Sequence, residues 1–384
     1  MKIVINTSTI SVGGAVQVAV NVIRYSFNLE NDEVYYVTNS HLYKLIPVDS
    51  KRVLVVDKSP ATIFKSKSKK EIIKYIDSIK PDVIYSVGAP SYINFKFLEV
   101  LRLTNPWIIN KLDSDVFKIF SFLKSSILKA KIIIQRRFLK NTRYFITQTE
   151  DARNKIINNL GKNPQEVFVI PNTISSNLLP YFNKSYIRNY VDKINVLIIA
   201  APYPHKNLEI TLKVAKILKE NNNKKYKFIV TVPVEFYQNT FLYKEIKKYG
   251  LEDYFENVGK VNLSELPSLF ERSHILLLPT LLEVFSVSLL EAMLFKLPII
   301  TTKYSFNLDV CKSAAVYIED PFDPSEILKH IIDVSTSIEL RDKLIKRGVE
   351  ILNEYISDRD IYKEHFAIIK EIISYENAFK QIKE

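Results

Sequence analysis

The stretch HILLLPTLLEVFSVSLLEAMLF, residues 274–295, passes from an apolar run through an uncharged loop into a helical pattern. HILLLPT predicts a strand, and SLLEAMLF predicts the helix that follows it. Glu283 lies in the loop, and Glu291 lies eight positions later, inside the helix. We therefore expect both carboxylates near the start of a helix, where unpaired N–H groups and the helix dipole favour a phosphate group.

Spacing alone leaves two interpretations of this pair open. In the first, the uncharged run from Val284 to Ser288 brings backbone N–H groups to a phosphate, and the two glutamates bind hydroxyl groups of a sugar and a ribose on either side. In the second, Ser288 and Glu291 form a capping box, in which the carboxylate only completes the N-terminus of the helix.

The rest of the chain repeats this alternation of strand and helix. KIVINTS predicts a strand, Gly13 and Gly14 predict a turn, and AVQVAVNVIRYSF has helical spacing. Further strands are predicted at EVYYVT, KRVLVV, DVIYSVG, PWIIN, YFITQT and VFVIPN, and then at INVLIIAA, YKFIVTV, FENVGKV and PIITT. The pattern predicts an α/β fold of two doubly wound, Rossmann-like domains that face each other across a cleft.

The length of 384 residues agrees with two domains, because single cores stop growing near about 250 to 300 residues. In segment 175–193 the apolar residues recur with neither the period of a helix nor that of a strand, and we interpret this segment as a linker. We predict an N-terminal domain at 1–175, a C-terminal domain at 190–356 and an amphipathic C-terminal helix at 357–384. One arrangement for this helix is to pack back on the N-terminal domain.

The composition indicates the cellular compartment of the protein and the charge of its partner. The single cysteine, Cys311, excludes an internal disulfide. The N-terminus lacks the pattern of a signal peptide, and no run of about 18 uncharged apolar residues occurs, so we expect a cytoplasmic protein. Residues 1–171 contain 26 lysines and arginines against 14 aspartates and glutamates, and thus carry the whole net charge of +12. This asymmetry predicts an anionic partner for the N-terminal half.

Segment 117–144 concentrates the positive charge, with eight lysines or arginines, no acid and many apolar residues between the cations. A basic, apolar-rich helix is typical of an element that binds an anionic membrane surface, which would place the protein on the inner face of the cytoplasmic membrane. The alternative is that the apolar residues are core and the cations form an ordinary solvated face.

The stretch LLPTLLEVFSVSLLEAMLFKLPIITT, residues 277–302, resembles the donor-binding segment of family 4 glycosyltransferases, with Glu283 and Glu291 at the positions of the E-x7-E motif. The resemblance continues in VGKVNLSELPSLFERS upstream and AAVYIEDPFDPSEI downstream, and extends in outline to the N-terminal half. It implies the GT-B fold, a UDP-sugar or GDP-sugar donor, and retention of anomeric configuration. It also implies that Glu291 binds the nucleotide ribose and Glu283 contacts the transferred sugar. The N–H groups from Phe285 through Ser286 to Val287 would bind the distal phosphate.

Glycine positions both support and depart from this resemblance. Gly13 and Gly14 match the family's glycine pair after the first strand, which lets the backbone approach the donor phosphate or the acceptor. The family usually has glycines beside the phenylalanine, where this chain has Val284 and Ser286. A side chain at each place narrows the approach of the backbone to the donor.

The segment AAPYPHKNLEI, residues 200–210, joins a predicted strand to a predicted helix. Lys206 is expected at the helix start, where a charged hydrogen bond to a pyrophosphate contributes about 1.5 to 3 kcal/mol. An arginine that the family commonly has five residues earlier is Ala201 here. His205 and Tyr203 are candidates to assist the lysine, the latter by stacking.

Asp113 and Asp115 form a D-x-D sequence in KLDSDV, after the predicted strand PWIIN. In GT-A glycosyltransferases such a motif holds a divalent metal, but here it lies far in sequence from the donor motif. The five histidines show no metal-ligand spacing, so we expect neither a metal nor another cofactor. Many family members have a histidine that faces the transferred sugar near this position, which makes Asp113 a candidate contact for the donor sugar or the acceptor.

The leading hypothesis is a retaining hexosyltransferase that moves a sugar from a nucleotide-sugar to a glycan or lipid-linked acceptor in bacterial surface polysaccharide synthesis, such as that of lipopolysaccharide. Its catalytic residues would be Glu283, Lys206 and Asp113. One alternative keeps the fold and changes the reaction to epimerisation or hydrolysis of a nucleotide-sugar. Another is a nucleic-acid-binding protein that uses the basic half, although no base-stacking pattern of aromatic residues accompanies the cations, and we expect no nucleic-acid partner.

Overall fold

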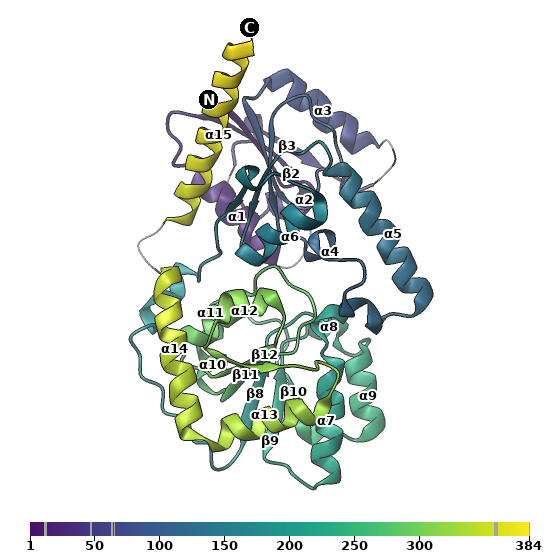
Figure 1. Ribbon diagram of the computed structural model, residues 1–384, viewed down its shortest axis with the longest axis vertical. Helices are drawn as coiled ribbons and strands as arrows, with labels where there is room; N and C mark the ends of the chain where they lie inside the picture. The colour runs from purple at the N-terminus through teal and green to yellow at the C-terminus, as the bar shows by residue number, and fades with distance from the viewer. Residues whose placement is uncertain (11–13, 47, 63, 65, 357–359, 384) are drawn as a thin grey trace. The chain divides into compact units, whose positions relative to one another are not determined.

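The computed structural model describes residues 1–10, 14–46, 48–62, 64, 66–356 and 360–383 (Figure 1). The chain divides into two compact units, Met1–Pro171 with Asp360–Glu384, and Asn172–Arg359. The described strands of each unit form one sheet in which all pairings are parallel. The α/β fold of two Rossmann-like units that the alternation predicts is therefore confirmed.

The sheet of the first unit has the strand order β3-β2-β1-β4-β5-β6-β7 over the described residues. Its strands are β1 (Lys2–Asn6), β2 (Glu33–Asn39), β3 (Val53–Val56), β4 (Val83–Gly88), β5 (Glu99–Leu103), β6 (Tyr144–Thr147) and β7 (Val167–Val169). The order reverses between β1 and β4, and such a reversal opens a crevice beyond the carboxyl ends of the two strands.

Helices cover both faces of this sheet. They are α1 (Gly14–Ser26), α2 (Ser40–Tyr43), α3 (Lys67–Ile79), α4 (Pro106–Ile109), α5 (Phe122–Phe138), α6 (Glu150–Leu160) and α15 (Ile361–Lys383), with 3-10 helices η1 (Ser50–Arg52), η2 (Asp115–Ile119) and η3 (Pro164–Glu166). Ile3 and Ile5 pack in one apolar cluster with residues of α1 and α15, whereas Val4 packs with residues of α3. This alternation along β1 is the period of two expected of a strand with both faces covered.

The sheet of the second unit has the order β10-β9-β8-β11-β12-β13 in the part of the chain that the structure describes. Its strands are β8 (Ile194–Ile198), β9 (Tyr226–Val230), β10 (Phe255–Asn257), β11 (Ile275–Leu278), β12 (Ile299–Thr302) and β13 (Ala315–Ile318). Helices α7 (Glu209–Glu220), α9 (Phe241–Tyr249) and α13 (Pro324–Thr336) pack on one face. Helices α10 (Leu266–Glu271), α11 (Val287–Leu294) and α12 (Ser305–Cys311) pack on the other, and α14 (Ile338–Ile356) contributes to both apolar clusters, through Leu344 to the first and Leu352 to the second. The remaining elements are α8 (Val234–Tyr237), η4 (Ser176–Tyr181), η5 (Pro204–Lys206) and η6 (Glu252–Tyr254).

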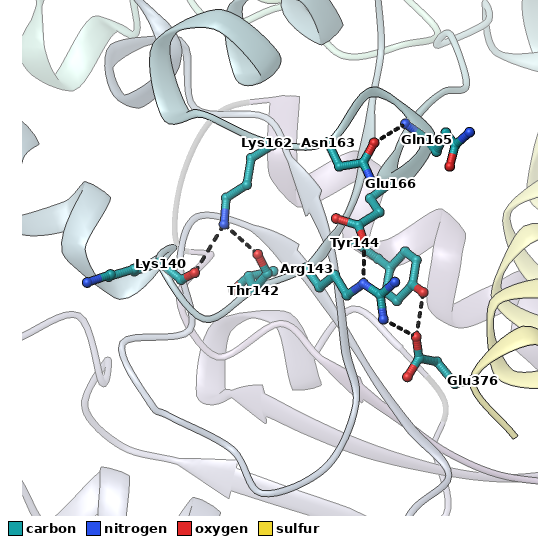
Figure 2. Close-up of polar contacts among 9 residues, drawn as sticks. All are labelled: Lys140, Thr142, Arg143, Tyr144, Lys162, Asn163, Gln165, Glu166 and Glu376. Atoms are coloured by element: carbon teal, nitrogen blue, oxygen red, sulfur yellow. Dashed lines mark hydrogen bonds and ion pairs between the residues drawn. The ribbon is translucent and has the colours of Figure 1, made fainter. Parts of the chain in front are cut away.

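Helix α15 belongs to the first unit, although it follows the second in sequence. Its residues Phe366 and Ile369 are buried with α1 in the core. At its far end, Glu376 pairs with the guanidinium of Arg143 and accepts a hydrogen bond of 2.6 Å from the hydroxyl of Tyr144 (Figure 2). Arg143 also pairs with Glu166, so one cation links the start of β6, the η3 turn and the C-terminal helix. Apolar burial and these polar contacts together hold α15 on this unit.

The prediction of a strand at PWIIN was wrong. These residues form α4, because the side chain of Asn105 caps the N–H of Trp107 at 3.0 Å and Pro106 occupies the first helical turn. The strand is instead β5, just before it, where the buried Arg102 interrupts the expected apolar run. Arg102 contacts the imidazole of His365, whose other ring nitrogen donates to the carbonyl of Ile361 at 2.6 Å.

The segment interpreted as a linker is packed on the second unit. Leu178 is buried in the core of this unit, and Tyr181, Phe182 and Tyr186 pack against the same apolar cluster. The guanidinium of Arg188 donates hydrogen bonds to carbonyl groups at or just after the C-terminal ends of α10 and α11, those of Phe270, Ser273, Phe295 and Lys296. These buried side chains and the hydrogen bonds of Arg188 follow no regular spacing along the sequence. The spacing of apolar residues therefore could not assign the segment to this unit.

Gly88, at the end of β4, lies at the crevice of the first sheet, where the backbone conformation and the close packing both favour a residue without a side chain. Its φ of +105° is a conformation that residues with a side chain rarely adopt. A Cβ atom at this position would lie 2.9 Å from Cγ1 of Ile10, in the segment that follows β1. The glycine thus lets the two segments at the point of strand reversal approach each other.

We expect Gly88→Ala to lower the free energy of unfolding by about 2 kcal/mol, because the substitution adds both backbone strain and a steric contact. Urea-induced unfolding measures the change. Gly14→Ala is the matched control, since a Cβ at residue 14 would meet no atom within 4 Å, and its stability should stay within about 0.5 kcal/mol of wild type. Equal unfolding midpoints for the two variants would contradict the role given to Gly88.

Candidate functional site

The second sheet reverses its strand order between β8 and β11, which are paired directly through Val196 and Ile275. The loops that follow these strands, 199–208 and 279–286, therefore leave the sheet side by side at its carboxyl edge. Two hydrogen bonds join them, since the carbonyl of His205 accepts from the N–H of Leu281 at 2.8 Å and from the hydroxyl of Thr280 at 3.2 Å.

Lys206 and Glu283 form an ion pair between these two loops. Their side chains are only 18% and 14% exposed, respectively. Lys206 ends the short η5 turn, three residues before α7, rather than lying at the helix start itself. Burial lowers the pKa of Lys206 to about 8, so the ammonium group loses its proton not far above neutral pH. Two residues predicted from separate motifs are thus brought into contact, and each neutralises the charge of the other.

His205 and Tyr203 lie beside the lysine. Their rings are stacked, with centroids 5.6 Å apart and planes at 6°. Burial, and secondarily the charge of Lys206, lowers the pKa of His205 to about 4. The imidazole is neutral at pH 7, so Lys206 is the charged member of this group of three. Tyr203 is 40% exposed and offers a ring face at the rim of the loop.

Glu291 lies in the middle of α11, which begins at Val287. The residue before the helix is Ser286, whose side chain makes no capping hydrogen bond, and Ser288 already lies in the first turn. The capping-box interpretation of Ser288 and Glu291 was therefore wrong. Burial raises the pKa of Glu291 to about 7, against a smaller opposite effect of a hydrogen bond from Ser288. A half-buried carboxyl group that is not needed to cap a helix is a candidate for binding a ligand.

Between the two glutamates, the first residues of the loop are apolar and buried, and the residue that precedes the helix is a serine. The side chains of Val284 and Phe285 are buried, and the ring of Phe285 packs edge-on against Tyr355 at 5.9 Å. Ser286 has a φ of −106°, which residues with a side chain adopt freely, so this backbone does not need the glycine that the family usually has here. The first N–H groups of α11 have no acceptors within the helix itself.

Buried polar side chains that the sequence analysis did not single out support these loops. The hydroxyl of Thr302 donates to the carbonyl of Thr280 at 2.6 Å, and the amide of Asn307 donates to Thr302. The amide of Asn207 donates to the carbonyl of Pro321 at 2.9 Å. The one signal for them in the sequence is polar residues at the ends of apolar strands, which is too common to identify a site by itself.

Three predicted residues belong to the first unit. Gly13 lies outside the described residues, and Gly14 begins α1. Asp113 is exposed in the loop between α4 and η2, and it therefore follows a helix rather than the strand that was predicted. It contributes to an open depression lined by Lys111, Leu112, Asp113, Lys129, Arg136 and Asn159.

The second aspartate of the D-x-D sequence has another partner. Asp115 forms an ion pair with Lys118 at 2.6 Å. Over the described parts of the chain, no three side chains of histidine, cysteine, aspartate or glutamate lie together as metal ligands. In the same residues, no helix is long and apolar enough to cross a bilayer.

Residues 183–350, which lie within the second unit, match the family model described as "Glycosyl transferases group 1". An O-antigen chain mannosyltransferase of Salmonella typhimurium is 21% identical over 211 residues, which are 54% of this chain and 56% of that protein. The chain thus spans little more than half the length of this curated relative.

Similarity to solved structures extends over nearly the whole chain. Sucrose-phosphate synthase from Thermosynechococcus elongatus has a TM-score of 0.70 at 13% identity, over 97% of this chain and 99% of that structure. The HepE protein of Anabaena, solved in complex with UDP-glucose, has a TM-score of 0.70 at 13% identity over 97% and 100%. These comparisons show the fold of the GT-B glycosyltransferases.

The raised pKa of Glu291 has a consequence for stability. Because the folded state binds this proton more tightly than the unfolded chain does, stability falls as pH rises from about 4.5 to 7 and remains lower above that range. We expect Glu291→Gln, which is neutral at every pH, to raise the free energy of unfolding by about 1 to 3 kcal/mol at pH near 8 and to have little effect near pH 5.

Urea-induced unfolding at the two pH values tests this expectation. Glu220→Gln, an exposed position at the end of α7, is the matched control and should change stability at neither pH. If Glu291→Gln destabilises the protein at the higher pH, the carboxylate has a structural role in α11 that outweighs the cost of its burial.

Proposed function

We propose that this protein is a retaining glycosyltransferase that transfers a hexose from a nucleotide-sugar to a glycan or lipid-linked acceptor. The observation that carries the proposal is the meeting of Lys206 and Glu283 beside the start of α11, at the point of strand reversal in the second sheet. The match to group 1 glycosyltransferases over 183–350 covers the same residues. We assign Glu283 and Glu291 to the E-x7-E motif of family 4 on this basis.

The donor binds, in this proposal, by exchanging ion pairs. The diphosphate of the donor forms an ion pair with the ammonium group of Lys206 and accepts hydrogen bonds from the N–H groups at the start of α11. The helix dipole adds to this attraction. The carboxylate of Glu283, released from the lysine, then accepts hydrogen bonds from hydroxyl groups of the sugar. Glu291 accepts from the ribose, which satisfies a carboxylate that is otherwise held at the cost of desolvation. UDP is the first nucleotide to examine, because HepE was solved with UDP-glucose.

The transfer replaces one bond to the anomeric carbon by another on the same face of the sugar. The bond from this carbon to the diphosphate oxygen breaks, the acceptor oxygen forms the new bond, and the departing phosphate takes the proton of the acceptor hydroxyl. Lys206 and the start of α11 stabilise the charge that develops on the diphosphate, which is electrostatic catalysis by groups already in place. No general base on the protein is required by this scheme.

We place the acceptor on the first unit, in the depression that contains Asp113. Lys111, Lys129 and Arg136 around it suit an acceptor that carries an anionic group, and the carboxylate of Asp113 suits a sugar hydroxyl. The similarity to an O-antigen chain mannosyltransferase supports a role in the synthesis of a bacterial surface polysaccharide. A cytoplasmic location agrees with a nucleotide-sugar as the donor.

Nucleotide binding is the first test. A thermal-shift panel with UDP, GDP, ADP and CMP, in EDTA, should show stabilisation of the wild type by one nucleotide, because a ligand at about 100 times its dissociation constant adds roughly 2.7 kcal/mol. Glu291→Gln and Lys206→Ala should lose most of the shift. Radiolabelled donor should then release nucleotide only when an acceptor glycan is present. Nucleotide release without any acceptor would replace transfer by hydrolysis, and the absence of any nucleotide shift would overturn the proposal.

The pKa of Lys206 predicts a pH dependence of donor binding. The ammonium group is the form that attracts the diphosphate, and its population in the free protein falls from pH 7 upward because the pKa is about 8. We expect the affinity for the stabilising nucleotide to fall about fourfold between pH near 7 and pH near 8.5. Isothermal titration calorimetry at the two pH values measures the change.

Lys206→Arg is the control for this dependence, because an arginine keeps its charge over the same range. Its affinity should stay nearly constant with pH, even if it is lower throughout. An equal fall for both proteins would assign the dependence to the nucleotide or to another residue.

A further inference from the structure

Helix α5 has two apolar faces, and only one of them has a partner in the first unit. Leu128, Ile132, Gln135 and Leu139 recur at i, i+4, i+7 and i+11, and these residues are buried or half-buried against the unit. The same spacing recurs at Leu123, Ile127, Ala130 and Ile134, five positions earlier along the helix, and all of these are exposed. Because five residues turn a helix by about 140°, the second stripe points away from the first.

The exposed stripe is wider than this spacing alone indicates. Phe122 is 89% exposed, Leu123 68%, Ile127 61% and Ile133 56%. Solitary exposed apolar side chains are ordinary on protein surfaces, but a continuous stripe on one helix marks a surface that binds something. The apolar residues of 117–144 can be core or surface by their sequence pattern, and α5 contains both kinds.

Cations border the stripe on both sides. Lys124 and Lys131 follow one edge of the helix, Lys140 lies beyond its end near the other edge, and Arg137 lies within the stripe; all four are exposed. Two further cations face the protein, since Lys129 lies over the ring of Phe117 at 4.9 Å and Arg136 donates to the carbonyl of Ile108 at 2.8 Å. No acid occurs in 117–144, so no residue of the segment offsets this charge.

From this arrangement we propose that α5 is a docking helix for an anionic phospholipid bilayer, which lies flat in the headgroup layer with its outer apolar stripe inserted. An apolar stripe with cations along its borders is complementary to a surface that has acyl chains below and phosphates above. The bordering lysines extend their charged ends toward the phosphates while their stems follow the apolar side chains. Over 17 residues the helix offers about 25 Å of contact parallel to the membrane.

The opposite edge of the same helix reaches the depression that contains Asp113. Lys129 and Arg136 line that depression together with Lys111. Docking would thus bring the depression close to the headgroup layer, where the polar part of a lipid-linked acceptor lies. This connection to the acceptor rests on the proposed function, whereas the docking itself does not depend on glycosyl transfer.

Vesicle binding of the full chain tests the proposal. The protein should co-sediment with vesicles that contain about 30 mol% phosphatidylglycerol in phosphatidylcholine, bind weakly to phosphatidylcholine alone, and lose affinity as NaCl rises from about 0.05 to 0.5 M. Each cation near an anionic surface strengthens binding about fivefold, so Lys124→Gln, Lys131→Gln and Arg137→Gln together should reduce the lipid partition coefficient on the order of 100-fold. Phe122→Ser, Leu123→Ser and Ile127→Ser together should reduce it more than about tenfold.

The matched control removes three exposed lysines from α3 of the same unit, by Lys67→Gln, Lys70→Gln and Lys74→Gln. It changes the net charge by the same amount and should keep at least half of the wild-type binding. The nucleotide-dependent thermal shift serves as a second control, because all three variants should retain it if they are folded. Loss of vesicle binding with retained nucleotide binding thus separates docking from the donor site.

Three results would overturn the proposal. The first is the absence of binding to anionic vesicles at the lowest salt concentration. The second is equal loss of binding in the α3 and α5 charge variants, which would show that net charge and not this helix is responsible. The third is a dimer in light scattering that becomes a monomer in the Phe122, Leu123 and Ile127 variant while vesicles remain unbound, which would identify a second copy of the chain as the partner of the stripe.

Discussion

The reversal of strand order between β8 and β11 leaves the loops after these two strands side by side at one edge of the sheet, and the candidate donor site is built from them. Residues 75 or more positions apart in sequence meet there, as in the ion pair of Lys206 with Glu283. The carbonyl of His205 joins the same loops through the backbone N–H of Leu281 and the hydroxyl of Thr280. The strand reversal of the parallel sheet thus brings the two loops together whatever side chains they carry.

The charged groups at this edge of the sheet are partly removed from water, which disfavours their ionised forms. Burial moves the pKa of Lys206 to about 8 and that of Glu291 to about 7, so each group is close to losing the charge that it carries at neutral pH. Burial also raises the pKa of Glu99 in the first unit, although Ser86 and Thr142 donate hydrogen bonds to its two oxygens.

The first unit shows how one helix can serve two surfaces. The inner stripe of α5 stabilises the unit, two of its cations line the depression with Asp113, and its outer stripe remains exposed. The positive charge that distinguishes the N-terminal half is concentrated on and around this helix.

Periodicity and turn residues in the sequence alone determined the α/β class, the two Rossmann-like units and the place of Glu283 and Glu291 after one strand and within the next helix, because these depend on local spacing. Local pattern misled where a cap decided the outcome, as for Asn105 and Pro106 in α4 and for Ser286, not Ser288, before α11. The tertiary structure decided which loops meet, and hence the contact of Lys206 with Glu283 and the packing of α15 on the first unit. It also decided which of the apolar residues of α5 are covered. These features depend on contacts between residues distant in sequence, which no local period encodes.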